Sequence, residues 1–287
     1  MDPRVDLHTH SDHSDGTLTP VQLVALAAER QLQLLALTDH DTTAGCAAAA
    51  QACQAHGIQF LAACELSALW RGREIHIVGL RVATAAPELI AHLELVRAQR
   101  IARLQAIGER LTRCGLDGAG LAAQVLALPG TPTRLHLARA LVAGGLAADT
   151  EAAFKRYLGR GQRAAVAPQW PTAEACIGVI NRAGGLAVLA HPHRYQLAAG
   201  ALRELCAHFH DSGGAGLEVS LAGMGPADAA QAAGLARRYG LAGSLGSDFH
   251  VPGLPWRPLG RWLKLAEGIT PITELLGFRP AGAPQPA

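Results

Sequence analysis

The sequence predicts an α/β fold of the parallel-sheet or barrel type, because short apolar runs alternate with helical patterns along most of its 287 residues. Hydrophobic residues make up 49% of the chain, which is enough for a large core. Histidines and carboxylates recur where the expected strands end. Together these observations indicate a barrel with its chemistry at one rim.

The expected elements follow in order from the spacing of the apolar residues. Strands are expected at 5–10, 34–39, 59–65, 74–80, 185–191, 216–220 and 242–247, and helices at 20–30, 43–56, 202–211 and 226–239. This alternation is typical of βαβ units, so we expect a parallel sheet or barrel with about seven strands.

A long helical stretch interrupts this alternation and predicts an inserted subdomain. Its first helix repeats apolar residues from Leu89 to Leu111 and is expected to stop at Cys114 and Gly115, a typical glycine terminator. Substrate recognition is assigned to this insertion, which would form a lid. The predicted parts are the first part of the barrel, the helical insertion, the second part of the barrel and a disordered Pro/Ala/Gly-rich tail, at residues 1–86, 87–171, 172–279 and 280–287.

Composition limits the kinds of partner that we expect the protein to bind and the compartment in which we expect it. A formal net charge of +2 with 17% charged residues leaves no strong global field to recruit nucleic acid or an anionic membrane. No run of 18 apolar residues is free of polar interruption, so no membrane span is expected. Six cysteines without a CxxC pair, and no signal peptide, fit a reducing cytoplasm. The sequence indicates no stable protein partner.

The start of the chain carries the strongest chemical signal. His8 and His10 alternate at the end of the first expected strand, so both imidazoles point the same way and can grip one metal ion. Other histidines and carboxylates lie on, at or just after the ends of further strands. The nine candidate metal ligands are His8, His10, Asp15, His40, Glu65, His76, His191, Asp248 and His250.

Two or three divalent ions are needed to account for this set. Clustering so many ionisable groups without a cation would cost several kcal/mol each. Nine ligands exceed the three or four that one tetrahedral ion uses, and Glu65 is the natural bridge between two ions. A carboxylated lysine is disfavoured as the bridge, because neither Lys155 nor Lys264, the only lysines, lies at an expected strand end.

Five motifs carry a family resemblance. HTHSDHSDG, LTDHD, the glutamate after the third strand, GLAVLAHP and SDFH resemble the successive motifs of the PHP (polymerase and histidinol phosphatase) family of metal-dependent phosphoesterases. The resemblance covers residues 1–81 and 184–260 and implies a distorted (β/α)7 barrel. TPTRLHLARALV and AFKRYLGRGQRAAV resemble the insertion of one branch, that of nucleotide bisphosphate phosphatases and RNase AM-like enzymes.

The resemblance also implies how the ligands are shared. The three implied sets are His8, His10, Glu65 and Asp248 for one ion, Glu65, His76 and His191 for a second, and Asp15, His40 and His250 for a third. Mixed imidazole and carboxylate ligands suit manganese, our first expectation, with zinc or iron as alternatives and magnesium less well suited.

A metal-bridging hydroxide is the expected nucleophile, since paired ions lower the pKa of water and neutralise phosphoryl oxygens. Ser11 and Ser247 adjoin candidate ligands, but neither heads a GxSxG elbow, so a serine nucleophile is not needed. Asp39 and Asp41 flank His40, and they either orient ligands or are solvated turn residues.

Four residues are candidates for contacting the substrate. Arg134 and His136 open an expected helix, whose N-terminus together with a guanidinium suits a phosphate. Arg160 lies in GRGQR and either clamps an anion or belongs to a solvated loop. His193 follows His191 by two residues and either protonates the leaving group, contacts phosphate or merely lines the rim.

These inferences predict a phosphatase acting on a small phosphorylated nucleotide, foremost on the 3′-phosphate of nucleoside 3′,5′-bisphosphates, converting pAp to AMP and phosphate. The alternatives are a 5′-to-3′ exoribonuclease acting on short 5′-phosphorylated RNA and a histidinol phosphate phosphatase. A non-enzymatic structural module is disfavoured, because the complete ligand set is present. Low basicity favours the nucleotide over RNA.

Overall fold

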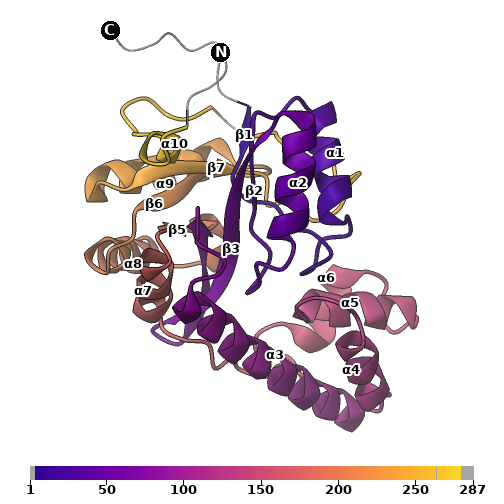
Figure 1. Ribbon diagram of the computed structural model, residues 1–287. Coiled ribbons are helices and arrows are strands. Elements are labelled where there is room, and N and C mark those ends of the chain that lie inside the picture. Colours follow the sequence, from indigo (N-terminus) through magenta and orange to yellow (C-terminus); the bar gives the residue numbers. More distant parts are fainter. Residues whose placement is uncertain (1–3, 263, 279–287) are drawn as a thin grey trace, which may run out of the picture.

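The computed structural model describes residues 4–262 and 264–278, and within them seven strands form one sheet that curls into a barrel (Figure 1). Each strand pairs with the next along the chain. The strands are β1 (Val5–Asp6), β2 (Leu34–Leu37), β3 (Gln59–Trp70), β4 (Arg73–Leu80), β5 (Leu186–Leu189), β6 (Gly216–Leu221) and β7 (Ala242–Gly246).

The first and last strands meet and nearly close the barrel. The Leu7 amide donates to the Leu245 carbonyl at 3.2 Å, and beyond the ends of the strands the Asp248 amide donates to the His8 carbonyl at 2.8 Å. These backbone hydrogen bonds partly cover the two outer strands, β1 and β7. The predicted α/β barrel is confirmed.

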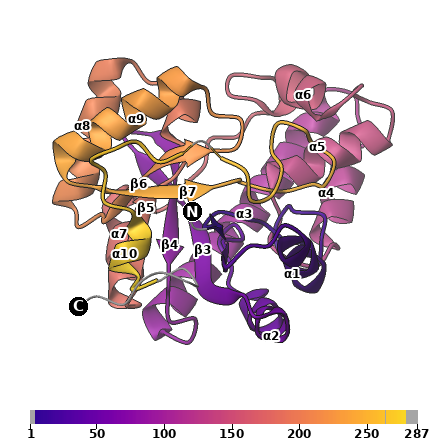
Figure 2. The same cartoon turned by 90° about the horizontal axis from the view of Figure 1, so that it is seen from above.

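Helices cover the barrel and build the insertion. The helices are α1 (Pro20–Glu29), α2 (Cys46–His56), α3 (Pro87–Arg113), α4 (Gly118–Leu126), α5 (Arg134–Ala143), α6 (Thr150–Ala153), α7 (Ala173–Arg182), α8 (Ala199–Asp211), α9 (Pro226–Tyr239) and α10 (Ile272–Leu275). A π-helical turn, η1 (Phe154–Leu158), and a 3₁₀ turn, η2 (Pro192–Tyr195), complete them. Seen from above, α8 and α9 lie to one side of the sheet and α4 to α6 to the other (Figure 2).

The expectation of a parallel sheet is wrong for β4, which runs antiparallel to both neighbours. Only Arg71 and Gly72 connect β3 to β4, and both have positive φ, 49° and 73°. Such a two-residue connection joins antiparallel strands only, because a parallel crossover needs a dozen or more residues. The hairpin also extends β3 to Trp70, five residues beyond its expected end at 65.

Several strands end earlier than expected, because the segments that carry polar ligand-type residues leave the ladder. Of the first expected strand, 5–10, only the part in β1 forms a regular strand. Thr9 beyond it makes an isolated bridge to Phe249. The expected strands at 34–39, 185–191 and 242–247 shorten in the same way. Helix α7 was not anticipated, and it packs against β3, β4 and β5.

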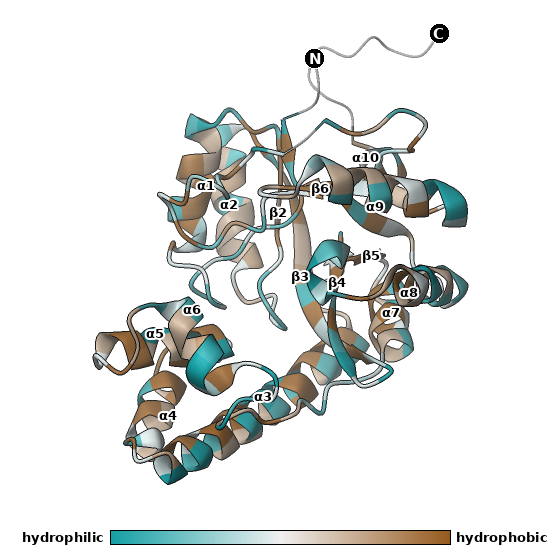
Figure 3. Cartoon of the chain, turned by 180° about the vertical axis from the view of Figure 1, so that it is seen from behind, coloured by the Kyte–Doolittle hydropathy of each residue, from teal (hydrophilic) through white to brown (hydrophobic). Residues whose placement is uncertain are grey.

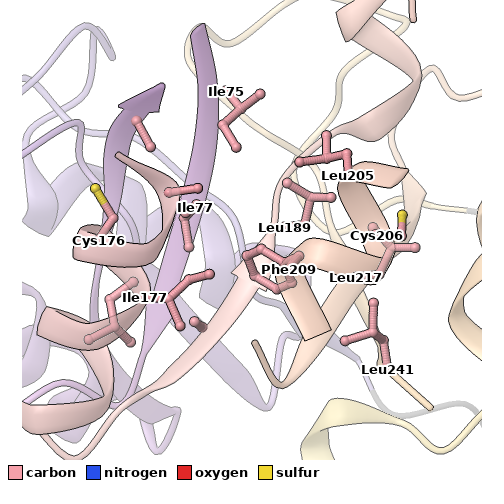
Figure 4. Close-up of a cluster of buried hydrophobic side chains, with 14 of the residues drawn as sticks. Ile75, Ile77, Cys176, Ile177, Leu189, Leu205, Cys206, Phe209, Leu217 and Leu241 are labelled. Carbon is pink, nitrogen blue, oxygen red and sulfur yellow. The ribbon is translucent and has the colours of Figure 1, made fainter. Parts of the chain in front are cut away.

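The main core lies between the sheet and helices α7, α8 and α9. Figure 4 shows Phe209 of α8 directed into this core beside Leu189 of β5 and Leu217 of β6, and all three side chains are fully buried. Such burial supplies the principal stabilising free energy of the fold.

The insertion has an apolar cluster of its own, which includes Leu104, Leu111 and Leu137. Helices α3 and α4 approach so closely that a Cβ on Gly118 would lie 2.0 Å from the Gly108 carbonyl oxygen. Figure 3 shows brown, hydrophobic positions on both of these helices. This separate cluster supports the proposed division into barrel and insertion, while the expected disordered tail at 280–287 lies outside the described residues.

None of the helices in the described part of the chain is both long and apolar enough to cross a bilayer.

Replacement of Phe209 by alanine tests the packing of the main core. We expect Phe209→Ala to lower the free energy of unfolding by about 3–5 kcal/mol, since it removes a buried ring and leaves a cavity. Urea denaturation measures the change, and Phe209→Leu, which keeps more of the volume, is the control with the smaller loss. Equal effects of both variants, or a loss below about 1 kcal/mol for alanine, would contradict this packing.

Candidate metal centre

The nine expected ligands converge at one rim of the barrel, where most are buried and the others are half-buried. One of them does not lie where the strand prediction put it, because Glu65 sits within β3 rather than at its end. His76 lies on β4 as expected, near the start of the strand. Because β4 runs antiparallel, its first half returns to the rim, and the His76 Nδ1 comes within 3.0 Å of Glu65 Oε1.

One group of ligand atoms has the spacing of a tetrahedral site. The Nε2 atoms of His8 and His10 are 3.1 Å apart, and both lie 3.3 Å from Glu65 Oε2. Asp248 Oδ1 is 3.4 Å from the first imidazole and 3.2 Å from the second. Ligands about 2.0–2.1 Å from one tetrahedral ion lie roughly 3.3 Å from each other, so the atoms of His8, His10 and Glu65 match three positions of such a coordination shell. Asp248 Oδ1 has this spacing to the two imidazoles.

A second group faces the other oxygen of Glu65. Nε2 of His191 lies 2.9 Å and Nδ1 of His76 3.0 Å from Glu65 Oε1. His8, His10 and His40 instead face Oε2, with His40 Nδ1 at 2.9 Å. One carboxylate therefore presents a different oxygen to each group, the arrangement a bridging ligand requires.

The third expected set also comes together. Asp15 Oδ1 lies 3.2 Å from His250 Nε2 and 3.8 Å from His40 Nε2. His10 joins this set, since the four residues place one ligand atom each within 4.8 Å of one another. The three expected sets are therefore not separate: His40 faces Asp15 with one nitrogen and Glu65 with the other.

The unsatisfied atoms test whether these residues fit a metal. Within the described chain, four buried atoms of the cluster lack a hydrogen-bond partner: Asp15 Oδ1, His40 Nδ1, Glu65 Oε2 and His191 Nδ1. Each such buried atom would cost about 1–3 kcal/mol if nothing coordinated it. Imidazole nitrogens and carboxylate oxygens are ligands that divalent transition metals accept, so the residues present fit divalent cations.

Comparison with known proteins agrees with this chemistry. The PHP domain family matches residues 6–114. The 5′-3′ exoribonuclease Rnm of Salmonella typhimurium is 46% identical over 271 residues, which cover 94% of this chain and 92% of the relative. The chain belongs to the PHP family.

Two further relatives from Chromobacterium violaceum support this membership. A 3′,5′-nucleoside bisphosphate phosphatase is 40% identical over 276 residues, covering 96% of this chain and 97% of its own. A solved amidohydrolase structure with bound sulfate and no metal has a TM-score of 0.90 and 38% identity, covering 97% and 99% of the two chains. The expected class of PHP enzyme, a metal-dependent phosphoric ester hydrolase, is confirmed.

The sequence analysis missed Glu218 of β6. Its Oε1 lies 2.6 Å from Nδ1 of His8, and its Oε2 accepts the backbone N–H of His191 at 2.5 Å. One buried carboxylate thus orients a residue from each of two PHP ligand groups, as a carboxylate behind a metal-binding imidazole does. A glutamate inside the otherwise apolar segment GLEVSL was the available signal.

Asp39 and Asp41 are buried and bonded, so neither is a solvated turn residue. Asp39 accepts from the hydroxyls of Ser11 and Ser14, both at 2.6 Å, and thereby holds the loop that follows His10. Asp41 accepts from Arg100 Nε at 2.8 Å and joins the rim to the insertion.

Backbone strain concentrates beside the cluster. Asp41, His191 and Asp248 have φ values of 48°, 29° and 51°, a region that residues other than glycine rarely adopt. Positions of this kind persist only where the surrounding structure over-determines them, and they are frequent at active sites.

The ionisable groups of the cluster strongly shift one another's pKa values. Burial alone would lower the pKa of His40, but the carboxylates of Glu65 and Asp15 outweigh it and raise the pKa to about 9. Burial and the neighbouring His250 lower the pKa of His10 to about 3. Burial would raise the pKa of Glu65, yet the imidazoles, led by His40, hold it well below its usual value. The Glu65 carboxylate is therefore ionised, as a metal bridge must be.

A pocket with an empty volume of about 580 Å³ opens between the PHP rim and the insertion. From the rim, Asp15, His40 and His76 line it. From the insertion and nearby strands, its lining includes Arg100, Arg103, Arg134, Phe154, Trp170 and Glu74. The lining of this pocket therefore combines candidate metal ligands of the rim with guanidinium groups.

Of the four expected substrate contacts, Arg134 alone lines this pocket. His136 is a partner in the helix cap, its Nδ1 accepting the Thr133 N–H at 3.1 Å. Arg160 is exposed after η1. His193 lies on η2, with a buried Nδ1 that has no hydrogen-bond partner in the described ranges. The roles assigned to these residues stay predictions.

Glu218→Gln tests the positioning of His8. We expect metal affinity to fall about 10- to 100-fold, because the amide cannot hold both the imidazole and the His191 N–H as the carboxylate does. Competition with a chromophoric chelator measures the affinity, and the exposed Glu94→Gln is the matched control. Unchanged affinity in Glu218→Gln would show that the carboxylate is dispensable.

Glu74 provides a pH test. Burial would raise its pKa, but Arg134 and Arg103 outweigh it and lower the pKa to about 2. A carboxylate with a depressed pKa stabilises the fold above its ordinary value of 4.5, and this contribution is lost as the pH falls toward 2. We therefore expect the unfolding free energies of wild type and Glu74→Gln, measured in chelator, to differ by roughly 2 kcal/mol near neutrality and to converge in acid. A difference independent of pH would contradict this, with Glu94→Gln as control.

Proposed function

We propose that this protein hydrolyses the 3′-phosphate ester of nucleoside 3′,5′-bisphosphates, converting pAp to AMP and phosphate. The observation that carries the proposal is the pocket joining the metal cluster to Arg134. A substrate with two phosphates needs two places for anions at a fixed separation. The rim supplies one and the insertion the other.

The proposed metal ligands are the nine residues of the rim, with two or three divalent ions, manganese foremost and zinc or iron as alternatives. Cations held there would lower the pKa of water and neutralise charge on the phosphoryl oxygens. Glu65 would bridge, and Asp248 would complete the set of His8 and His10. The five distances of 3.1–3.4 Å among these groups support this assignment.

The insertion is proposed to hold the remote phosphate. Arg103 and Arg134 share the single carboxylate of Glu74, at 3.3 Å and 3.0 Å, so the trio keeps one net positive charge beside the pocket. Guanidinium groups bind phosphate through paired N–H donors. His136 and Arg160 are proposed to assist.

In the reaction, the water oxygen bonds to phosphorus, the bond from phosphorus to O3′ breaks, and O3′ takes up a proton. His193 is proposed to donate that proton or to contact the phosphate. Burial and the neighbouring Arg194 lower the pKa of His193 and favour the neutral imidazole, whose single N–H suits a hydrogen bond to a phosphate oxygen better than transfer of a proton to O3′. Its buried Nδ1, unpaired among the residues described, supports such a role.

A second candidate is 5′-to-3′ exonucleolytic trimming of short 5′-phosphorylated RNA. The same bond from phosphorus to O3′ would be hydrolysed while the 5′-phosphate lies near Arg134, and a relative with 46% identity is an exoribonuclease. Histidinol phosphate ranks below both, because it carries no second phosphate for the insertion. For the compartment we propose the reducing cytoplasm, which six free cysteines suit.

Arg134→Ala tests the proposal with two substrates. We expect kcat/KM for pAp to fall about 10- to 100-fold, since a charge-assisted contact to the 5′-phosphate is lost, while 3′-AMP, which lacks that phosphate, changes less than about twofold. Phosphate release by manganese-loaded protein measures both.

The exposed Arg113→Ala is the control for loss of positive charge on the insertion. Equal losses on pAp and 3′-AMP would remove the role given to Arg134. Failure of the wild type to release phosphate from pAp would overturn the proposed function itself.

A further inference from the structure

A tryptophan stands exposed on the loop 251–262, which follows the ligands Asp248 and His250. Trp256 is 60% exposed, whereas Trp70 and Trp170 are only 6% and 4% exposed. Single exposed apolar side chains are common on protein surfaces, but this one adjoins Arg257, which contacts Asp248 of the cluster.

The loop reaches the metal cluster through the next residue. Nη1 of Arg257 lies 3.6 Å from Asp248 Oδ2, an oxygen that also accepts a hydrogen bond from Arg194. The other oxygen of Asp248 faces His8 and His10. Two guanidinium groups thus share one carboxylate oxygen, and this side of the cluster keeps positive charge that suits a phosphate.

This surface is separate from the insertion pocket. A second hollow is lined by 221–224 and by residues of the loop, including Trp256, Arg261 and Trp262, and it shares no lining residue with the insertion pocket. The loop leaves the cluster by way of Asp248, whereas the insertion pocket adjoins Asp15, His40 and His76. A substrate longer than one nucleotide could therefore contact both surfaces.

The loop is anchored to the barrel. The Gly260 amide donates to Asp6 Oδ2 at 2.8 Å, and Leu259 is 2% exposed in the cluster beneath α1 and α2. A Cβ on Gly223 would lie 2.9 Å from the Trp256 carbonyl oxygen, so the backbone there is in close contact with the segment after β6. The indole is consequently presented from a fixed base.

We propose that Trp256 and Arg257 form a subsite for the nucleotide that follows the scissile phosphate in a short 5′-phosphorylated single-stranded RNA. The indole would stack on the base of that nucleotide, and Arg257 would contact the phosphate. The inference rests on the proposed function, since it assumes hydrolysis of the same bond from phosphorus to O3′. In pAp this second nucleotide is absent, so the subsite serves oligonucleotides alone.

Charge and chemistry favour this occupant over another protein. Stacking on an aromatic side chain is tolerant of base identity, and arginines beside it match a polyanion. Arg257 and Arg261 both follow Trp256 in the sequence PWRPLGR, and there is no acidic residue in 251–262.

The test compares pAp with the 5′-phosphorylated dinucleotide pApU, using manganese-loaded Trp256→Ala, Trp256→Phe and wild type. Release of AMP measures kcat/KM for each substrate. We expect Trp256→Ala to lower the ratio of kcat/KM for pApU to that for pAp by roughly 5- to 100-fold, mainly through KM. Trp256→Phe, which keeps a ring for stacking, should restore most of the ratio, and the exposed Leu275→Ala on α10 is the control.

A binding measurement gives a second readout. Quenching of tryptophan fluorescence by pApU with a methylene group in place of the bridging O3′ should be weaker in Trp256→Phe than in wild type. An unchanged pApU/pAp ratio in Trp256→Ala would overturn the subsite while leaving pAp hydrolysis intact. A change in oligomeric state of Trp256→Ala would also overturn it, because the indole would then belong to an interface between copies. If the wild-type protein does not hydrolyse pAp, the proposed function itself is refuted.

Discussion

The side chain of Glu65 is the point on which the rest of the site depends. It is fully buried, and five imidazoles face its two oxygens at 2.9–3.3 Å. These imidazoles come from β4 and from segments following β1, β2 and β5, so one carboxylate ties much of the barrel together electrostatically. A buried charge so surrounded is stable only if the neighbours carry compensating positive charge, as protons or as cations. Metal binding and the geometry of the rim therefore depend on each other.

The sheet topology brings neighbouring side chains to this carboxylate. The reversal of β4 at Arg71 and Gly72 brings His76 back to the rim, and the outward extension of β3 makes room for the hairpin. The insertion is fastened to the same rim by a buried ion pair, in which Arg100 of α3 binds Asp41 and also donates to Ser67 Oγ at 2.8 Å. Asp41 is adjacent to His40, so the same ion pair holds both the wall of the pocket and a proposed metal ligand.

The nine rim residues could be predicted from the sequence because histidine and carboxylate at successive strand ends have no packing explanation. The antiparallel direction of β4 could not be predicted, because an apolar run has the same pattern in a parallel and in an antiparallel strand. Only the two-residue turn that begins at Arg71 decides between the two directions. Glu218 was missed because a lone glutamate in a strand carries no pattern, and its partners lie 210 and 27 residues away in sequence. His136 was predicted to contact phosphate from its place at a helix start, and its hydrogen bond to the Thr133 backbone in the helix cap was not foreseen. Contacts between segments that are far apart in the sequence produce no local sequence pattern, whereas the periodicity of helices and strands does.

The most direct measurement is anomalous diffraction from crystals of the manganese-loaded protein. Glu65 as the shared ligand predicts at least two anomalous peaks, one coordinated by each oxygen of its carboxylate, with His8 and His10 at the first and His76 and His191 at the second. A single peak, or peaks that leave either oxygen of Glu65 without a metal contact at saturating manganese, would contradict the account.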